Sequence, residues 1–356
     1  YTLVYTLSLH DALPISEIAL DLSLKKGKLI NFDFKNLKTD INYKNKKLVF
    51  NNLTAISGEK EVNGSGNFKL KEESPQISAQ LSLEHIAYSD LDNYIEPSLP
   101  LTGTIKADIN IEGKMNNPGF SGSISSTNTK LKLTDRTYNF DSFDLEFSRK
   151  TSDYYLIDSL KLTKDKSVLG LNGEIKNKQL NLTFNLENGK LSLLNIDPPI
   201  EGIAQIHGEI NGSVASPEIT STFETEEFRY NNIIFNNSKG LLAYSDQELK
   251  LKKCNFNYGN GKYKITGNIT SLLNTPEFNL EMQVIRGDLE SIQTLIDVDL
   301  PLALDYNLAG KVKLKGTLKK PEAQVDLYGY SGNKANGNLS IKGELGKTLD
   351  LNIKGE

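Results

Sequence analysis

The chain lacks the residues on which most metal and disulfide sites depend. Its 356 residues include one cysteine, Cys254, and three histidines, His10, His85 and His207, and contain no tryptophan. A single cysteine excludes an internal disulfide framework, and so few sulfur and imidazole ligands argue against a structural zinc or iron–sulfur site. We therefore expect no metal and no cofactor.

Long apolar runs and an excess of one charge are also missing. The 41 Lys and Arg residues nearly balance 45 Asp and Glu residues, which leaves a formal net charge of −4. The mean hydropathy is −0.39, and no apolar run approaches the roughly 18 residues of a membrane-spanning helix. These features argue against a nucleic-acid partner and against a helical membrane domain in this stretch.

The first residues are not part of the predicted fold. Residues 5–16 resemble the translation of a common sequencing adapter. We interpret residues 1–16 as an adapter-derived artefact, exclude them from the fold reasoning and expect the natural protein to be longer.

From Ile18 onward the dominant signal is alternation of apolar and polar residues with a period of two. The clearest runs extend over residues 77–83, 105–111, 180–186 and 278–284. This period is typical of a strand with one buried and one wet face. Turn residues separate the runs, and the pair Asn260-Gly261 predicts a two-residue hairpin. The sequence therefore predicts sequential antiparallel strands.

Helical patterning is confined to two short segments. Residues 88–95 and 288–296 carry apolar residues three or four positions apart, and Asp288 can cap the second segment. Each segment precedes a Pro-Leu step, and Pro199-Ile200 occupies the corresponding place in the middle of the chain.

These coincidences reveal an internal repeat of about one hundred residues. Gly113, Gly212 and Gly316 are each followed five positions later by a proline, at spacings of 212 − 113 = 99 and 316 − 212 = 104 residues. We predict a partial β-repeat at 17–65, full repeats at 66–172 and 173–266, and an incomplete repeat at 267–356.

A sheet with one apolar face must cover that face or present it to an apolar guest. A repeat of this length favours units that stack, and few helices are predicted to cover the face. We therefore predict an all-β fold, an extended, twisted antiparallel β-groove with short helices between its repeats.

The residues around the repeat glycines resemble a known family. Residues 308–322, LAGKVKLKGTLKKPE, and 206–219, IHGEINGSVASPEI, are similar to the glycine-strand-glycine-loop-proline repeats of the TamB (translocation and assembly module) and AsmA-like proteins. The resemblance extends from about residue 18 to the end, and it does not separate TamB-like from AsmA-like members.

The resemblance implies a function in the envelope of a diderm bacterium. Such proteins are anchored in the inner membrane, cross the periplasm, conduct phospholipids towards the outer membrane and assist outer-membrane biogenesis. The implied partners are phospholipid acyl chains, an Omp85-type outer-membrane barrel protein and, through an anchor absent from this sequence, the inner membrane.

The predicted lining of the groove is the apolar phase of the clearest strands. It comprises Leu81, Leu83, Ile105, Ile109, Ile111, Leu180, Leu182, Phe184, Ile206, Ile210, Phe278, Leu280, Val284, Val312 and Leu314.

We interpret several other sequence features as structural rather than as catalytic or ligand-binding. His85 and His207 lie 122 residues apart, and Cys254 has no accompanying histidine motif. The pairs Glu72/Glu73 and Glu226/Glu227 fall in predicted loops and are interpreted as solvated charge. Glycines 64, 66, 259 and 261 open no helix, so they are read as hairpin or bulge glycines rather than phosphate loops.

Three classes of function remain open. The favoured one is a lipid-conducting groove without enzymatic activity, and the alternative is a structural or adhesive cell-surface β-repeat whose apolar faces close into dry sandwiches. A polysaccharide-cleaving enzyme is the weakest, because the chain has no tryptophan and no convincing carboxylate pair.

Overall fold

The computed structural model describes residues 17–29, 32–70, 74–90, 101–133, 136–194, 199–272, 275–296, 307–317, 320–331, 334–344 and 350–354. The chain forms two compact units, Tyr1–Leu160 and Lys161–Glu356, here called unit 1 and unit 2. Strand β12 (Tyr154–Lys164) contains the division between them. The predicted adapter-derived residues 1–16 lie outside the described residues.

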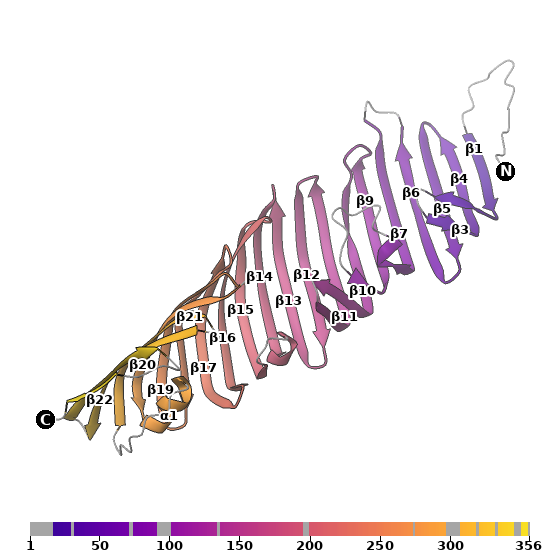
Figure 1. Ribbon diagram of the computed structural model, residues 1–356. Coiled ribbons are helices and arrows are strands. Elements are labelled where there is room, and N and C mark those ends of the chain that lie inside the picture. The colour runs from indigo at the N-terminus through magenta and orange to yellow at the C-terminus, as the bar shows by residue number, and fades with distance from the viewer. Residues whose placement is uncertain are drawn as a thin grey trace. The chain divides into compact units, whose positions relative to one another are not determined.

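Unit 1 is built almost entirely from β-strands (Figure 1). Its elements are β1 (Glu17–Leu24), β2 (Gly27–Leu29), β3 (Phe32–Phe34), β4 (Asn36–Lys44), β5 (Lys47–Ser57), β6 (Lys60–Lys69), β7 (Gln76–Ala87), η1 (Tyr88–Asp90), β8 (Leu101–Thr102), β9 (Thr104–Lys114), β10 (Gly119–Leu133) and β11 (Arg136–Thr151). The strands pair antiparallel in the order β1-β4-β5-β6-β7-β9-β10-β11, with β8 beside β10. Strands β2 and β3 form a separate hairpin.

Unit 2 continues the same antiparallel pattern without any strand inserted out of order. Its elements are β13 (Ser167–Lys176), β14 (Gln179–Lys190), η2 (Leu191–Leu194), β15 (Ile200–Ser213), β16 (Ser216–Tyr230), β17 (Ile233–Ser245), β18 (Glu248–Tyr258), β19 (Gly261–Thr270), β20 (Glu277–Gly287), α1 (Leu289–Ile296), β21 (Asn307–Thr317), β22 (Lys320–Ser331), β23 (Lys334–Glu344) and β24 (Asp350–Lys354). Each strand pairs with the next along the chain. The prediction of an all-β, sequential antiparallel fold is confirmed.

The short helical elements follow equivalent strands. Helix η1 follows β7, η2 follows β14 and α1 follows β20, and the two-residue strand β8 and six longer strands, β9 to β14, lie between the first two helices. Six strands, β15 to β20, also lie between the second and third. The predicted helix at 288–296 is confirmed as α1. In the predicted segment 88–95, Tyr88–Asp90 form the 3-10 helix η1, and residues 91–95 lie outside the described residues.

The repeat glycines occupy equivalent positions, each next to last in its strand, and they share the same unusual backbone conformation. Gly113, Gly212 and Gly316 have φ angles of 113°, 84° and 107°, and each lies at the end of a strand that leads into a two-strand hairpin. Positive φ is accessible to glycine at little cost, which explains why this residue type recurs at the period. The predicted repeat boundaries at 66, 173 and 267 fall on matching positions of β6, β13 and β19, and the division into four repeats stays a prediction.

Three hairpin turns depend on residues other than glycine. Both central residues have positive φ in Asn45-Lys46, Asn177-Lys178 and Asp246-Gln247, as a type I′ turn requires. The predicted turn at Asn260-Gly261 is displaced by one residue, because Tyr258 pairs with Gly261 and the turn residues are Gly259 and Asn260. Gly259 takes the positive φ of 53° there.

Glu226/Glu227 corrects a second local prediction. Both residues lie within β16 rather than in a loop, and both are exposed. The register between β15 and β16 shifts beside them, between Gly202 and Gln205, and this irregularity places two exposed residues in succession within the strand. The other pair, Glu72/Glu73, lies outside the described residues.

Replacing Gly267 tests how strictly the backbone of the sheet demands glycine. Its φ angle is 138°, and an added Cβ would lie 2.2 Å from the carbonyl oxygen of Asn279 on the neighbouring strand. We expect Gly267→Ala to lower the free energy of unfolding by about 1–3 kcal/mol, measured by urea denaturation. Asn279→Ala, which changes only an exposed side chain, is the control. Equal free energies of unfolding for the two variants would contradict the expected backbone strain and clash at position 267.

Candidate functional site

The strand registers place the predicted lining residues of unit 1 on one face of its sheet. Leu81 lies opposite Ile109, and Ile86 lies opposite Ile105. Directly opposite residues of an antiparallel pair point to the same side. The other predicted residues of this unit, Leu83 and Ile111, share the phase. We call this side of each sheet the apolar face.

The ten predicted lining residues of unit 2 also share one face. Leu182 lies opposite Ile210, and Leu280 lies opposite Leu314. The rest follow from the same registers; they are Leu180, Phe184, Ile206, Phe278, Val284 and Val312. The phase predicted from the sequence is therefore the phase of the folded sheet, whereas the role of these residues as a lining stays a prediction.

The opposite side of each sheet is polar and carries exposed ion pairs. Lys106 contacts Glu84 at 2.7 Å, and Lys311 contacts Glu281 at 2.9 Å. The hydrogen bond from each lysine lowers the pKa of its glutamate below the usual value. Such exposed pairs contribute little to stability, so this face is a solvated surface.

Bulges keep the apolar face continuous where strict alternation would break it. In β7 the residues Leu83 and Ile86 are three positions apart, but their partners on β9, Ala107 and Ile105, are two apart. His85 is part of this bulge in β7. Its φ angle of 57° turns the Ile86 side chain to the apolar face. His85 itself is exposed. Equivalent shifts occur at Leu186/Gly189 in β14 and at Val284/Gly287 in β20.

Asparagine supplies the left-handed residue at several such irregularities. Asn52, Asn128, Asn188 and Asn237 have φ angles between 47° and 56°. Asparagine tolerates this conformation better than most residues because its side chain bonds locally to the backbone.

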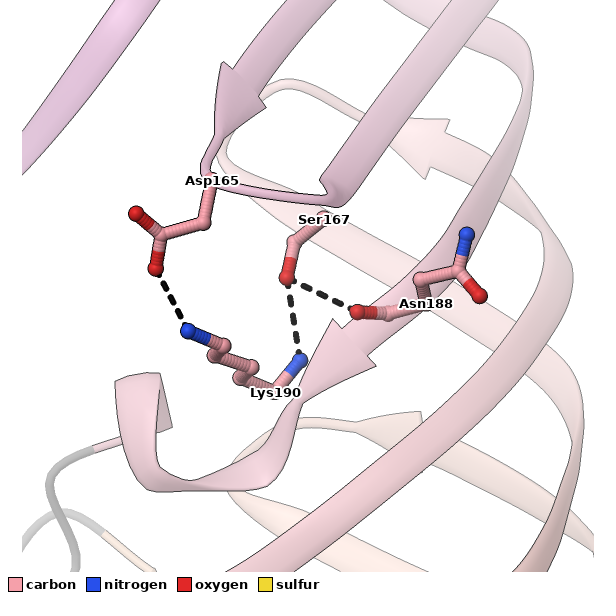
Figure 2. Close-up of polar contacts among 4 residues, drawn as sticks. All are labelled: Asp165, Ser167, Asn188 and Lys190. Carbon is pink, nitrogen blue, oxygen red and sulfur yellow. Dashed lines mark hydrogen bonds and ion pairs between the residues drawn. The ribbon is translucent and has the colours of Figure 1, made fainter.

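A polar network fixes the bulge that precedes η2 (Figure 2). The Ser167 hydroxyl donates to the carbonyl oxygen of Asn188 at 2.8 Å and accepts the Lys190 N–H at 3.1 Å. The Lys190 ammonium pairs with Asp165 at 2.5 Å. The turn between β12 and β13 is thereby tied to the end of β14, and η2, which follows at Leu191, packs against β15.

In unit 1 the margin of the apolar face beside η1 is covered. Tyr88 of η1 is 5% exposed and packs with Ile86, Ile105 and Ala107. Phe34 of the β2–β3 hairpin joins the same cluster. Burial raises the pKa of the Tyr88 phenol, so this side chain remains neutral.

In unit 2 the helix α1 covers the equivalent margin. Leu289 and Ile292 are 3% and 1% exposed and pack against Tyr263, Val284 and other residues of β19 to β22. Asp288 caps the helix, because its carboxylate accepts the Ser291 N–H at 2.7 Å and the Ser291 hydroxyl at 2.9 Å. This bears out the predicted cap. Burial strongly raises the pKa of the Tyr263 phenol.

The remainder of the apolar face is only half-buried. Of the fifteen predicted lining residues, Ile105, Leu182, Val284 and Val312 are buried and the other eleven are half-buried. Within the described ranges, the sole sheet besides the large one is the two-stranded β2–β3 hairpin. Among the residues that the structure describes, no second large sheet therefore packs on this face in either unit.

The predicted lining did not include the glycines that lie on the apolar face or the aromatic rings beside them. Gly66 and Gly208 occupy the apolar phase, and a Cβ on either would lie within 2.7 Å of the ring of Phe50 or Phe184. These glycines make room for aromatic rings from the neighbouring strand. Glycine in the apolar phase of a strand beside an aromatic-rich one is the signal that could have located Phe50.

Among the described residues no group of three His, Cys, Asp or Glu side chains is placed to hold a metal ion. His207 lies exposed in β15, and Cys254 is buried in β18 beside a register shift. The face that carries the predicted lining residues is apolar and largely half-buried in each unit.

Comparison with known proteins adds no identification. The chain matches no family model, no curated protein and no solved structure. In the part of the chain that the structure describes, no helix is long and apolar enough to cross a membrane.

Shortening Ile292 tests whether α1 shields the apolar face. The side chain is 1% exposed, so Ile292→Ala should lower the free energy of unfolding by about 2–5 kcal/mol and increase binding of an apolar fluorescent dye. Glu290→Ala, on the exposed side of the same helix, should change neither. Unchanged dye binding by Ile292→Ala would contradict the shielding.

Cys254 provides a test of burial on the apolar side of β18. It is 4% exposed, and burial raises the pKa of its thiol, so little reactive thiolate exists at about pH 8. We expect slow labelling by a thiol reagent in buffer and rapid labelling in denaturant. Rapid labelling of the folded chain would place the thiol in solvent instead.

Proposed function

We propose that this chain is a segment of a TamB/AsmA-like envelope protein that shields phospholipid acyl chains on an apolar β-surface and conducts lipids between the inner and outer membranes. The observation that carries the proposal is the half-buried apolar face of each unit, which no second large sheet covers among the described residues. A large apolar surface that stays accessible to water indicates that the protein binds an apolar ligand.

The physical requirement of lipid shielding matches this surface. Each methylene removed from water contributes about 0.8 kcal/mol, and a uniform apolar surface supplies that energy at every position along it. Because no position differs strongly from the next, a chain can shift along the surface without a large barrier. No reaction and no cofactor enter such a function.

The structural or adhesive alternative would need dry sandwich cores. The only large buried clusters that the described residues form lie beneath η1 with the β2–β3 hairpin and beneath α1. Residues such as Leu81, Ile111 and Leu280, which belong to neither cluster, remain half-buried. This distribution favours a guest over a second sheet. Periplasmic location and an Omp85-type partner belong to the same proposal and rest on the sequence resemblance.

Photo-crosslinking distinguishes the two functions. A photoreactive amino acid would be placed at matched positions on four strands, on the apolar face at Leu81, Ile109, Ile210 and Leu280 and on the polar face at Gln80, Asn110, Asn211 and Asn279. The 356-residue chain would be directed to the periplasm of a diderm bacterium, irradiated in cells and analysed by mass spectrometry for attached lipid.

Lipid adducts confined to the apolar set are the expected result. Because each control lies next to its test residue in the same strand, the two sets differ in face and not in depth along the chain. Protein–protein crosslinks at the apolar set, with no more lipid than the controls, would contradict the proposal and favour the dry structural repeat.

A further inference from the structure

A row of lysines crosses the sheet of unit 1 at the rim formed by the β4–β5 turn and the ends of β6 and β9. Lys44 lies opposite Lys47, and Lys47 lies opposite Lys69. Gln76 follows Lys69 in the register, and Lys114 lies opposite Gln76. We call Lys44, Lys47, Lys69 and Lys114 the lysine row; all four are exposed.

Among the described residues, one member of the lysine row has an ion-pair partner. Lys44 contacts Glu17 at 2.8 Å, whereas Lys47, Lys69 and Lys114 have no ion pair with a described residue. Like charges directly opposite one another destabilise a sheet, and Lys46 in the adjoining turn adds a further cation. An external anion at this rim would offset that repulsion.

Apolar side chains stand at the same rim and are held there by backbone hydrogen bonds. Leu70 directly follows Lys69 and is 44% exposed, and Met115 directly follows Lys114 and is 53% exposed. The Leu70 N–H donates to the carbonyl of Lys46 at 2.8 Å, and the Met115 N–H donates to the carbonyl of Pro75 at 2.7 Å. The rim therefore presents cations beside fixed apolar groups, which is the chemistry of a site for an anionic amphiphile.

We propose that the lysine row binds the phosphate groups of anionic phospholipids whose acyl chains lie on the apolar face of unit 1. The inference rests on the proposed function and adds a headgroup class and a place to it. The rim is the open side of the face, because η1 and the β2–β3 hairpin cover the cluster near the opposite ends of these strands. The lysine row belongs to the polar phase of the sheet, since Lys47 and Lys69 alternate with Leu48 and Phe68 of the apolar phase. These long side chains would reach a headgroup on the apolar side by bending around the end of the strands.

Unit 2 contains a natural comparison at the corresponding rim. There Lys176 lies opposite Gln179, Gln179 opposite Ser213 and Ser213 opposite Ser216. Val214 is 56% exposed, and its N–H donates to the carbonyl of Lys178 at 3.0 Å. The apolar display is thus retained, Lys176 occupies the position of Lys69, and Ser213 replaces Lys114. This rim of unit 2 therefore carries fewer cations in the register, and we expect it to select headgroups by charge less strongly than the lysine row.

Vesicle flotation with the full 356-residue chain tests the inference. The vesicles would contain phosphatidylcholine alone or phosphatidylcholine with phosphatidylglycerol. The test variant combines Lys47→Gln, Lys69→Gln and Lys114→Gln. The control variant removes the same charge from exposed lysines of unit 2, by Lys176→Gln, Lys178→Gln and Lys252→Gln.

We expect the unaltered chain to prefer the phosphatidylglycerol vesicles and the test variant to lose that preference. At low ionic strength the loss should be about fivefold for each lysine removed, and added salt should reduce the preference of the unaltered chain as well. The control variant should bind like the unaltered chain. Equal binding by all three chains, or equal loss in the test and control variants, would overturn the inference.

Two more measurements distinguish a lipid headgroup site from a structural role of the lysines and from a site for free anions. Thermal unfolding should show that the test variant is at least as stable as the unaltered chain, since like-charge repulsion is removed; a loss of stability would indicate a structural role and count against the site. Inorganic phosphate alone, titrated at constant ionic strength, should not displace the chain from vesicles. Displacement would identify a free-anion site and overturn the headgroup assignment.

The outcome is independent of the crosslinking result. Lipid adducts on the apolar face together with an unaffected test variant would leave the proposed function standing and remove only the headgroup site. Charge-dependent vesicle binding without adducts on the apolar face would remove the acyl-chain function instead.

Discussion

Cross-strand register is the constraint on which the rest of this structure depends. Side chains alternate between the two faces of a strand, so a shift of one residue in any pairing would move a whole set of apolar residues to the wrong face. Each strand of unit 2 pairs with its neighbour along the chain, and Leu182, Ile210 and Ile219 illustrate how one phase is carried from strand to strand. An error in one hairpin would be passed on to those that follow.

Turns and bulges are the devices that protect this register. Type I′ turns such as Asn45-Lys46 and Asn177-Lys178 fix the pairing at one end of a hairpin. Bulges at residues such as His85 and Asn188 absorb one extra residue at the other end and re-aim the chain into the short helices. The same irregularity that interrupts the sequence pattern thus preserves the apolar face and positions the element that covers its margin.

In the proposed function, one face of the sheet keeps the chain in solution and the other binds lipid. Polar residues and exposed ion pairs keep one face wetted, while the helices cover only a margin of the other. Complete coverage would give an ordinary hydrophobic core, and no coverage would leave an aggregation-prone surface. Half-burial at residues such as Leu81 and Leu280 is the compromise that a transient apolar guest requires. The lysine row extends the same logic to an amphiphile, because one end of such a molecule is charged.

The sequence by itself determined the strand content, the antiparallel order and the apolar phase. Alternation over residues 77–83 or 278–284 depends only on the two-residue geometry of a strand, and the recurring glycines at 113, 212 and 316 reflect a φ angle that few other residues adopt. Only the tertiary structure decided which of those residues are covered and which stay half-open. Ile105 and Ile109 belong to the same run, yet the first is buried with Tyr88 and the second is not. Likewise, Lys47 and Lys69 become neighbours only when β5 and β6 pair. Burial and charge clustering are properties of contacts between strands, and a pattern within one strand does not contain them.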